Sequence, residues 1–144
     1  MIKDKIIPLV LALLSVTIVL YGIFFVPISK VTIYIFKKEI FLNDINEKAI
    51  YIFLILSIIS ILFSFTKYRI ISMLSGIISY IYMIYEIYEL YITYDKLGKY
   101  KENIEVLNGM YIIIIGNTLL LIVLIFNYIL YRVKKYKKCE ETVK

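Results

Sequence analysis

A stripe of polar side chains follows one face of the third long apolar segment, residues 70–91. Two sets of residues recur along it every seven positions: Ser72, Ser79, Glu86 and Thr93, and Ser75, Tyr82 and Glu89. That spacing returns a side chain to the same face of a helix, so the stripe changes from hydroxyls to carboxylates along its length. Two carboxylates one turn apart, among tyrosine hydroxyls, could bind a cation or exchange a proton. We therefore define a candidate polar site made of Glu86, Glu89, Tyr82 and Tyr85.

The same residues also have a purely structural interpretation. At about 1.5 Å per residue, Glu86 lies about 24 Å from the start of its segment, near one end of a helix that crosses a membrane. The carboxylates could then face water or the lysines Lys30 and Lys96, while the tyrosines form an interfacial belt. Both interpretations, the cation or proton site and the helix end, stay open at this stage.

The composition excludes several kinds of catalytic and metal site. The chain has no histidine and one cysteine, Cys139. This excludes histidine acid–base chemistry, a cysteine–histidine zinc site and an internal disulfide. No other constellation of nucleophile and base stands out, so we expect no catalytic residue, no metal ligand and no cofactor, and we predict that the chain is not an enzyme.

Four long apolar segments must position these residues. They cover 6–26, 49–66, 70–91 and 104–131, in a chain that is 62% hydrophobic with a mean hydropathy of +0.86. Each is close to the ~20 apolar residues that cross a bilayer. The first segment exceeds the ~7–15-residue core of a signal peptide, so we expect it to be retained. The predicted fold class is an all-α integral membrane protein, a four-transmembrane-helix bundle forming one domain over 1–144.

Small residues indicate which helix faces touch, because helices in lipid associate by close packing. The first and second segments each carry a stripe of small residues, exemplified by Ser15 and Gly22 and by Ser57 and Ser60. The third and fourth segments supply the candidate helix-packing residues Ser72, Ser75, Gly76, Ser79, Gly109 and Gly116.

The connection 27–48 is the one long loop between the segments. Its β-branched and aromatic run 31–36 is followed by Lys37 and Lys38 and then by Glu-Ile-Phe-Leu at 39–42. This pattern predicts a small extracytoplasmic β-hairpin over 31–42, and the alternative is an extended loop that dips into the membrane interface. The candidate outer contact surface comprises Val31, Ile33, Ile35, Ile40 and Leu42.

The positive charges indicate the orientation. The net charge is +6, and with both termini inside, ten basic residues are cytoplasmic and seven are outside. We therefore predict a multi-pass protein of the cell membrane with both termini cytoplasmic and no role in nucleic-acid binding. The basic tail, 132–144, would anchor on anionic lipid headgroups of the bilayer. Its candidate anchoring residues are Arg132, Lys134, Lys135, Lys137 and Lys138.

The fourth segment carries a short motif, and the whole chain carries a familiar layout. Residues 108–121, with Gly109, Tyr111, Gly116 and Leu119, resemble the Gly-x-Tyr-Leu-x-x-Ile-Gly-x-x-Leu signature of many small four-span proteins of Gram-positive bacteria. The layout resembles the claudin-like tetraspan plan, which implies β-strands in the first outer loop. The tryptophans and paired cysteines of claudins are absent, so no binding residue is carried over.

The leading functional hypothesis is a non-enzymatic tetraspan membrane protein that acts by self-association or by binding another membrane protein, with the predicted hairpin as its outer contact. One alternative is an oligomeric, ion-conducting pore lined by the third helix. Another is an immunity or accessory subunit for a toxin or a transporter. The orientation of the Ser72–Ser79–Glu86 stripe separates packing from a pore, because pore-lining residues must face an axis between copies.

Overall fold

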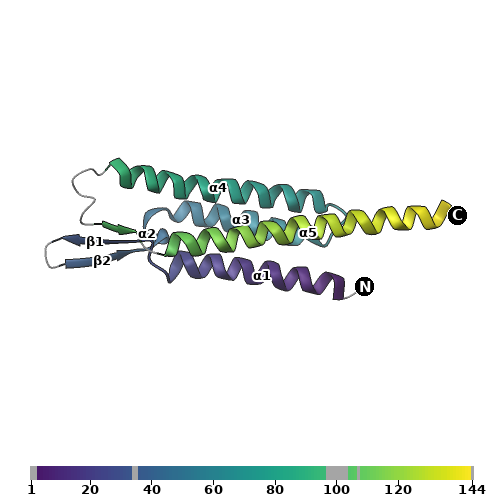
Figure 1. The fold of residues 1–144 in the computed structure, drawn as a ribbon, viewed down its shortest axis with the longest axis horizontal. Coiled ribbons are helices and arrows are strands. Elements are labelled where there is room, and N and C mark those ends of the chain that lie inside the picture. Colours follow the sequence, from purple (N-terminus) through teal and green to yellow (C-terminus); the bar gives the residue numbers. More distant parts are fainter. Residues whose placement is uncertain (1–2, 34–35, 97–103, 107, 144) are drawn as a thin grey trace.

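The computed structural model describes residues 3–33, 36–96, 104–106 and 108–143. Its elements in chain order are α1 (Lys3–Phe24), β1 (Ser29–Ile33), β2 (Phe36–Ile40), α2 (Leu42–Ile45), α3 (Glu47–Ser64), α4 (Arg69–Lys96), β3 (Ile104–Val106) and α5 (Gly109–Val143). The four long helices lie side by side, and the strands project from one end of them (Figure 1). Both chain ends lie at the opposite end of the bundle.

Four helices among the described residues are long and apolar enough to cross a membrane. These stretches are Ile6–Phe24, Glu47–Ser64, Arg69–Lys96 and Gly109–Tyr136. Their outward-facing side chains are apolar and exposed, as at Ile55 (57%), Leu62 (63%) and Phe126 (58%). Water would penalise such a surface, whereas lipid matches it. The prediction of four helices long and apolar enough to span a membrane is confirmed.

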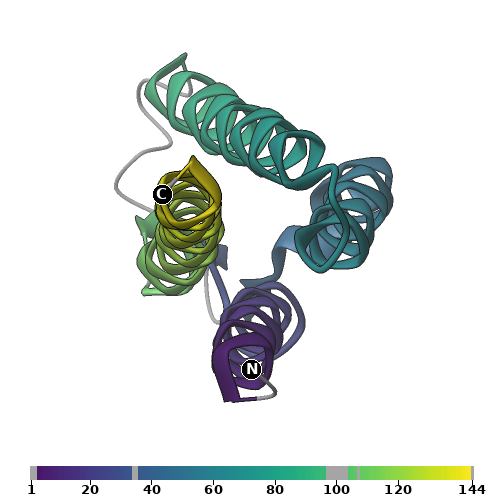
Figure 2. The ribbon, with the colours of Figure 1, turned by 90° about the vertical axis from the view of Figure 1, so that its right-hand side faces the viewer.

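The helices pack in the order α1–α5–α4–α3 rather than in chain order. α5 lies against both α1 and α4, and α4 lies against α3. The view along the bundle in Figure 2 shows α1 and α3 apart, with α5 reaching both α1 and α4. Close α1–α5 contact depends on glycines: a Cβ on Gly116 would lie 2.8 Å from Val19 Cγ2, and one on Gly22 would lie 2.9 Å from Ile113 Cγ1.

We call the end of the bundle that carries the strands its outer end and the end that carries both termini its inner end. The sheet at the outer end has the strand order β2-β1-β3, and both pairings are antiparallel. The predicted hairpin is therefore present, although its strands span 29–40 and Leu42 belongs to the short helix α2. Ile35 of the predicted hairpin lies outside the described residues. Across the central strand, Lys30 pairs with Glu39 of β2 and with Glu105 of β3.

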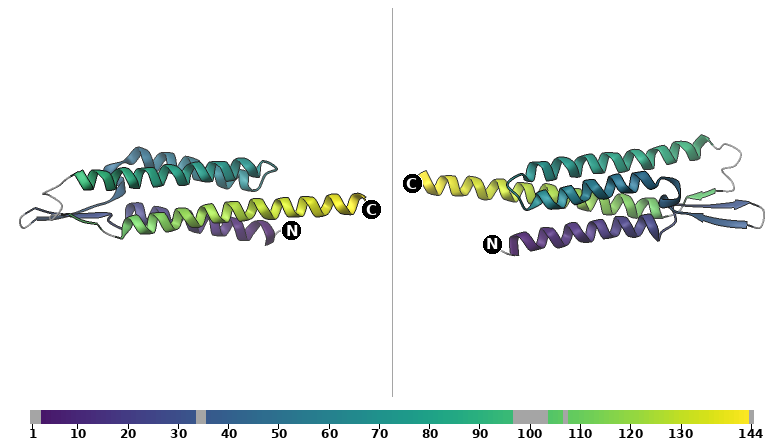
Figure 3. Two further views of the ribbon diagram at one scale, coloured as in Figure 1. Left: turned by 45° about the horizontal axis from the view of Figure 1, so that its top comes forward. Right: turned by 180° about the vertical axis from the view of Figure 1, so that it is seen from behind.

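The prediction of a fourth helix from 104 is wrong at its start. Ile104–Val106 forms β3, and α5 begins only at Gly109. The start is fixed by the chain leaving α1, since the Gly109 backbone N–H donates to the Pro27 carbonyl oxygen at 3.3 Å. At its other end α5 continues to Val143, so the tail expected after 131 is helical and projects beyond the bundle (Figure 3).

Candidate functional site

Glu86 of the candidate polar site contacts the start of α3. Its Oε2 accepts a hydrogen bond from Asn46 Nδ2 at 2.7 Å. Asn46 precedes α3 and its Oδ1 accepts from the Ala49 backbone N–H at 3.1 Å, which caps that helix. The amide of Asn46 therefore joins the α3 terminus to the outer half of α4.

Glu89 has a different environment. It is exposed, and its Oε1 accepts a hydrogen bond from the Tyr85 hydroxyl at 2.8 Å on the outer face of α4. Tyr82 is half-buried and its hydroxyl interacts with Glu86. The four residues thus form two separate pairs rather than one ring, and no cluster of three or more acidic, histidine or cysteine side chains occurs in the described part of the chain.

Buried serines connect α3 to α4. The Ser60 and Ser75 hydroxyl oxygens lie 2.7 Å apart in a hydrogen bond, and the Ser72 hydroxyl donates to the Ser60 carbonyl oxygen at 2.6 Å. Ser72, Ser75 and Ser79 are all at most 5% exposed. Gly76, Gly109 and Gly116 are buried as well. The serine part of the α4 stripe therefore faces the interior of a single chain, whereas Glu89 and Thr93 at its outer end are exposed.

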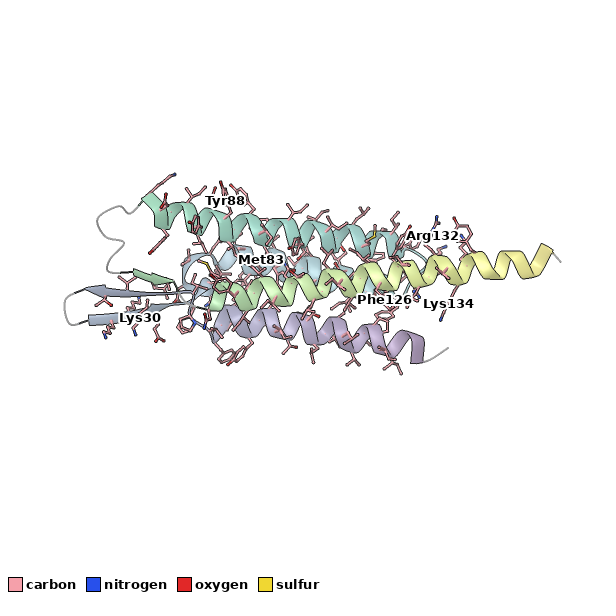
Figure 4. All side chains as sticks on the ribbon, in the orientation of Figure 1. Lys30, Met83, Tyr88, Phe126, Arg132 and Lys134 are labelled. Atoms are coloured by element: carbon pink, nitrogen blue, oxygen red, sulfur yellow. The ribbon has the colours of Figure 1, made fainter. Side chains whose placement is uncertain are left out.

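Three buried polar side chains near the middle of the bundle have no hydrogen-bond partner among the described residues. They are Ser57 and Ser79, through Oγ, and Asn117, through Nδ2. Phe53 and Met83, each 0% exposed, lie one helical turn outward on α3 and α4, between these groups and Glu86; Figure 4 shows Met83 on the inner side of α4. Apolar packing therefore interrupts the polar stripe before it reaches the outer carboxylate.

A polar cluster at the inner end of the bundle was not anticipated from the sequence. Arg69 Nη1 donates to Asn127 Oδ1 at 3.0 Å, and Asn127 Nδ2 donates to the Ser64 carbonyl oxygen at 3.1 Å. The Arg69 guanidinium also lies 4.6 Å from the centroid of the Tyr131 ring. These contacts join α3, α4 and α5 beside the short α3–α4 turn. The sequence signal that could have revealed this cluster is Asn127 in the fourth segment, because an amide within a membrane must find hydrogen-bond partners.

The candidate outer contact residues turn mostly inward. Leu42 is 1% exposed, and Val31 and Ile40 are half-buried. The exposed positions of β2 are instead charged, namely Lys37, Lys38 and Glu39. Ile33 belongs to β1. The exposed side chains described on β2 are therefore charged rather than apolar.

A cavity of about 270 Å³ separates the sheet from the outer end of α4. Its lining includes Val31, Ile40, Ile45, Leu90, Thr93 and Met110. The side chains are apolar apart from the hydroxyls of Ser29, Thr93, Tyr91 and Tyr94. Ser29 and Val31 line it from β1 and Ile40 from β2, because alternate residues of a strand share one face.

The candidate headgroup-anchoring residues lie along the part of α5 that leaves the bundle. Arg132, Lys134 and Lys135 are exposed there, and Figure 4 places Arg132 and Lys134 beyond the inner ends of the other helices. Arg132 Nη2 donates to the Tyr136 hydroxyl at 3.3 Å. Lys137 and Lys138 belong to α5.

No family model matches the chain, and neither does any curated protein or solved structure.

Proposed function

We propose that this chain is a non-enzymatic membrane protein that binds another membrane protein through the β2 edge of its outer sheet. In the orientation proposed, both termini are cytoplasmic and the sheet is extracytoplasmic, in the cell membrane. The observation that carries the proposal is the edge of β2, which has no strand beside it among the described residues and bears the exposed lysines Lys37 and Lys38. A free edge offers backbone groups to a further strand.

The charges on this edge select the partner. Lysines on an edge strand discourage pairing with neutral strands. A strand that places carboxylates opposite Lys37 and Lys38 would convert that penalty into attraction. The partner that fits is therefore an extended, acidic segment at the outer surface of the same membrane.

The direction of the strands argues against a second copy at this edge. The strands run nearly along the long axis of the bundle (Figures 1 and 3). Two copies in one membrane would be related by an axis along that same direction, so their β2 strands would be parallel and at equal height. Each N–H would then face the same N–H of the other copy, whereas a parallel ladder pairs N–H with carbonyl groups. Lys37 and Lys38 would also face their own copies.

The ion-conducting alternative needs the α4 stripe to face an axis between copies. Ser72 and Ser79 are at most 2% exposed, and Ser72 is hydrogen-bonded to α3 of its own chain. This arrangement favours packing over a shared lumen. An accessory or immunity role is compatible with the proposal, since it also consists of binding one membrane partner.

Native mass spectrometry of the protein, extracted in mild detergent from its own membranes, tests the proposal. The wild type should carry an additional protein mass beside its own 17.0 kDa. In the Lys37→Glu/Lys38→Glu variant, the proportion of protein that carries the additional mass should fall about tenfold or more, because acidic groups would then face like charges.

The matched control is Lys134→Glu/Lys135→Glu, which changes the net charge equally at the opposite end of the molecule. It should retain the partner. A closed ring of 17.0 kDa copies with no other protein would contradict the proposal and favour the pore.

A further inference from the structure

The cavity between the sheet and α4 lies where the outer end of the bundle meets the membrane boundary. α4, Arg69–Lys96, is long and apolar enough to cross a membrane, and the cavity is lined by its last outer turns, from Leu90 to Tyr94. The sheet covers it from the other side through Ser29, Val31 and Ile40. The cavity thus lies at the depth where lipid headgroups give way to acyl chains.

The cavity is continuous with the lipid-facing surface of α4. Tyr91 lines the cavity and is also 60% exposed. Tyr88, one turn further into the membrane, is 59% exposed and points away from the bundle in Figure 4. An acyl chain can therefore pass from the bilayer along these aromatic side chains into the cavity without crossing a polar barrier.

The size of the cavity limits what it can hold. Ligand pockets that enclose a drug-sized molecule have about 300–1,000 Å³. At about 270 Å³, this cavity takes a segment of one chain rather than a whole lipid. Its few hydroxyls lie at Ser29, Thr93 and the two tyrosines, which suits the ester-bearing upper part of an acyl chain.

Cationic side chains lie outward of the apolar lining. Lys38 lies on the same face of the sheet as Ile40 and opposite Val31 of β1. It is two residues further from the bundle along β2 than Ile40. Lys96 follows Thr93 by one helical turn at the end of α4. Both lysines are exposed. The order from the membrane outward is therefore an apolar cavity and then positive charge, which matches an acyl chain below an anionic headgroup.

From this order we infer that the cavity binds one anionic phospholipid of the outer leaflet. The upper part of one acyl chain fills the cavity, and the phosphate lies between Lys38 and Lys96. This lipid would brace the sheet against α4 at a place where the protein itself leaves space.

The test uses purified protein in mild detergent with equal amounts of dioleoyl phosphatidylglycerol and dioleoyl phosphatidylcholine, and native mass spectrometry counts the adducts. The wild type should retain one phosphatidylglycerol in preference to phosphatidylcholine, by about fivefold for each lysine. Lys96→Gln should reduce that preference about fivefold, and this variant leaves the β2 edge intact. An unchanged preference would overturn the headgroup assignment.

A second variant tests the chain itself. Thr93→Trp should fill the cavity and lower retention of the bound phosphatidylglycerol about tenfold. Losing the contact with a few methylene groups of the acyl chain is enough for an effect of that size. The matched control is Thr17→Trp on the exposed surface of α1, which should bind as the wild type does. If Thr93→Trp does not fold, Ser29→Leu fills the same space from β1.

Equal retention in the filled variant and in the control would overturn the proposal. Copurification of a single lipid other than a phospholipid, such as a polyprenyl phosphate, would overturn the assignment of its class. A second protein chain displacing the lipid from the wild type would overturn the assignment of the cavity to lipid.

Discussion

Ser57 and Ser60 lie one turn apart on the same face of α3 and have opposite energetic roles. Ser60 is 0% and Ser57 1% exposed. The Ser60 hydroxyl bonds to Ser75 and to the Leu56 carbonyl oxygen at 2.7 and 2.8 Å. The Ser57 hydroxyl has no partner among the described residues. A buried polar group contributes to stability only when it is paired, so the two serines should respond differently to the same substitution.

Ser60→Ala should lower the free energy of unfolding by about 1 kcal/mol, whereas Ser57→Ala should be neutral or stabilising. Titration with sodium dodecyl sulfate in mild detergent, followed by helical circular dichroism, measures both values. An equal loss in the two variants would show that Ser57 has a partner, such as a bound water, and would contradict this account.

Glu86 and Glu89 form a second matched pair. Glu86→Leu leaves the Asn46 amide without its acceptor, so we expect a loss of about 1–3 kcal/mol in the free energy of unfolding. Glu89→Leu removes only an exposed contact with Tyr85 and should change it by less than about 0.5 kcal/mol. The same titration compares them, and the account fails if Glu89→Leu is the more destabilising variant.

The pairing of the polar residues was only partly predictable from the sequence. The seven-residue period placed Ser72, Ser75 and Ser79 on one face, and these three are buried together. It could not reveal that Glu86 bonds to Asn46, 40 residues earlier, because local spacing carries no information on which helix lies opposite. For the same reason it could not reveal that Arg69 bonds to Asn127, 58 residues later.

At the scale of elements, the start of α5 is held against the chain that leaves α1. A Cβ on Gly109 would lie 2.6 Å from the Val26 carbonyl oxygen and 2.8 Å from that of Pro27. Both are backbone atoms, which cannot move without shifting α1 or β1. Gly76 differs, since its closest neighbour is the end of the Leu124 side chain.

Gly109→Ala should therefore destabilise the fold by about 1–3 kcal/mol. Gly76→Ala should be close to neutral, because the Leu124 side chain can rotate and alanine favours a helix by about 1 kcal/mol over glycine. Unfolding in sodium dodecyl sulfate again supplies the comparison. If Gly76→Ala were the more costly change, the α4–α5 contact would be tighter than the structure indicates.

The strand at Ile104–Val106 shows why one boundary was mispredicted. An apolar run is compatible with a helix or with a strand, and periodicity over three residues cannot distinguish them. What decides is the edge of β1 that β2 leaves unpaired, where Val31 pairs with Ile104 and Ser29 with Val106 of β3. That edge is supplied by a hairpin more than 60 residues earlier in the sequence, so only the assembled fold could reveal it.

For the whole molecule, the sequence predicted how many helices are long and apolar enough to span a membrane, but not which helices are neighbours. The order α1–α5–α4–α3 depends on Gly22 and Gly116 allowing α1 to approach α5. Every segment carried small residues, so composition alone allowed several arrangements. Both chain ends lie at the end of the bundle opposite the sheet, as an even number of long antiparallel helices requires, and the orientation that we propose makes that end cytoplasmic.

Cysteine labelling tests that orientation. Cys139 is the one cysteine of the chain and follows the apolar stretch Gly109–Tyr136, so in the proposed orientation a membrane-impermeant maleimide should modify it only after the cells are permeabilised. Cys139→Ser combined with Glu39→Cys should instead be labelled in intact cells, since Glu39 is exposed on β2. Labelling in the reverse pattern would place the sheet in the cytoplasm.

The most direct test of the central claim is photocrosslinking from the β2 edge in the native membrane. A photoreactive residue replaces Glu39, which leaves Lys37 and Lys38 unchanged, and a control carries it at Leu14, a position on the apolar surface of α1 that is 55% exposed. The account predicts a discrete adduct with a different membrane protein from position 39 and none from position 14. An adduct of twice 17.0 kDa from position 39, or no protein adduct there at all, would contradict it.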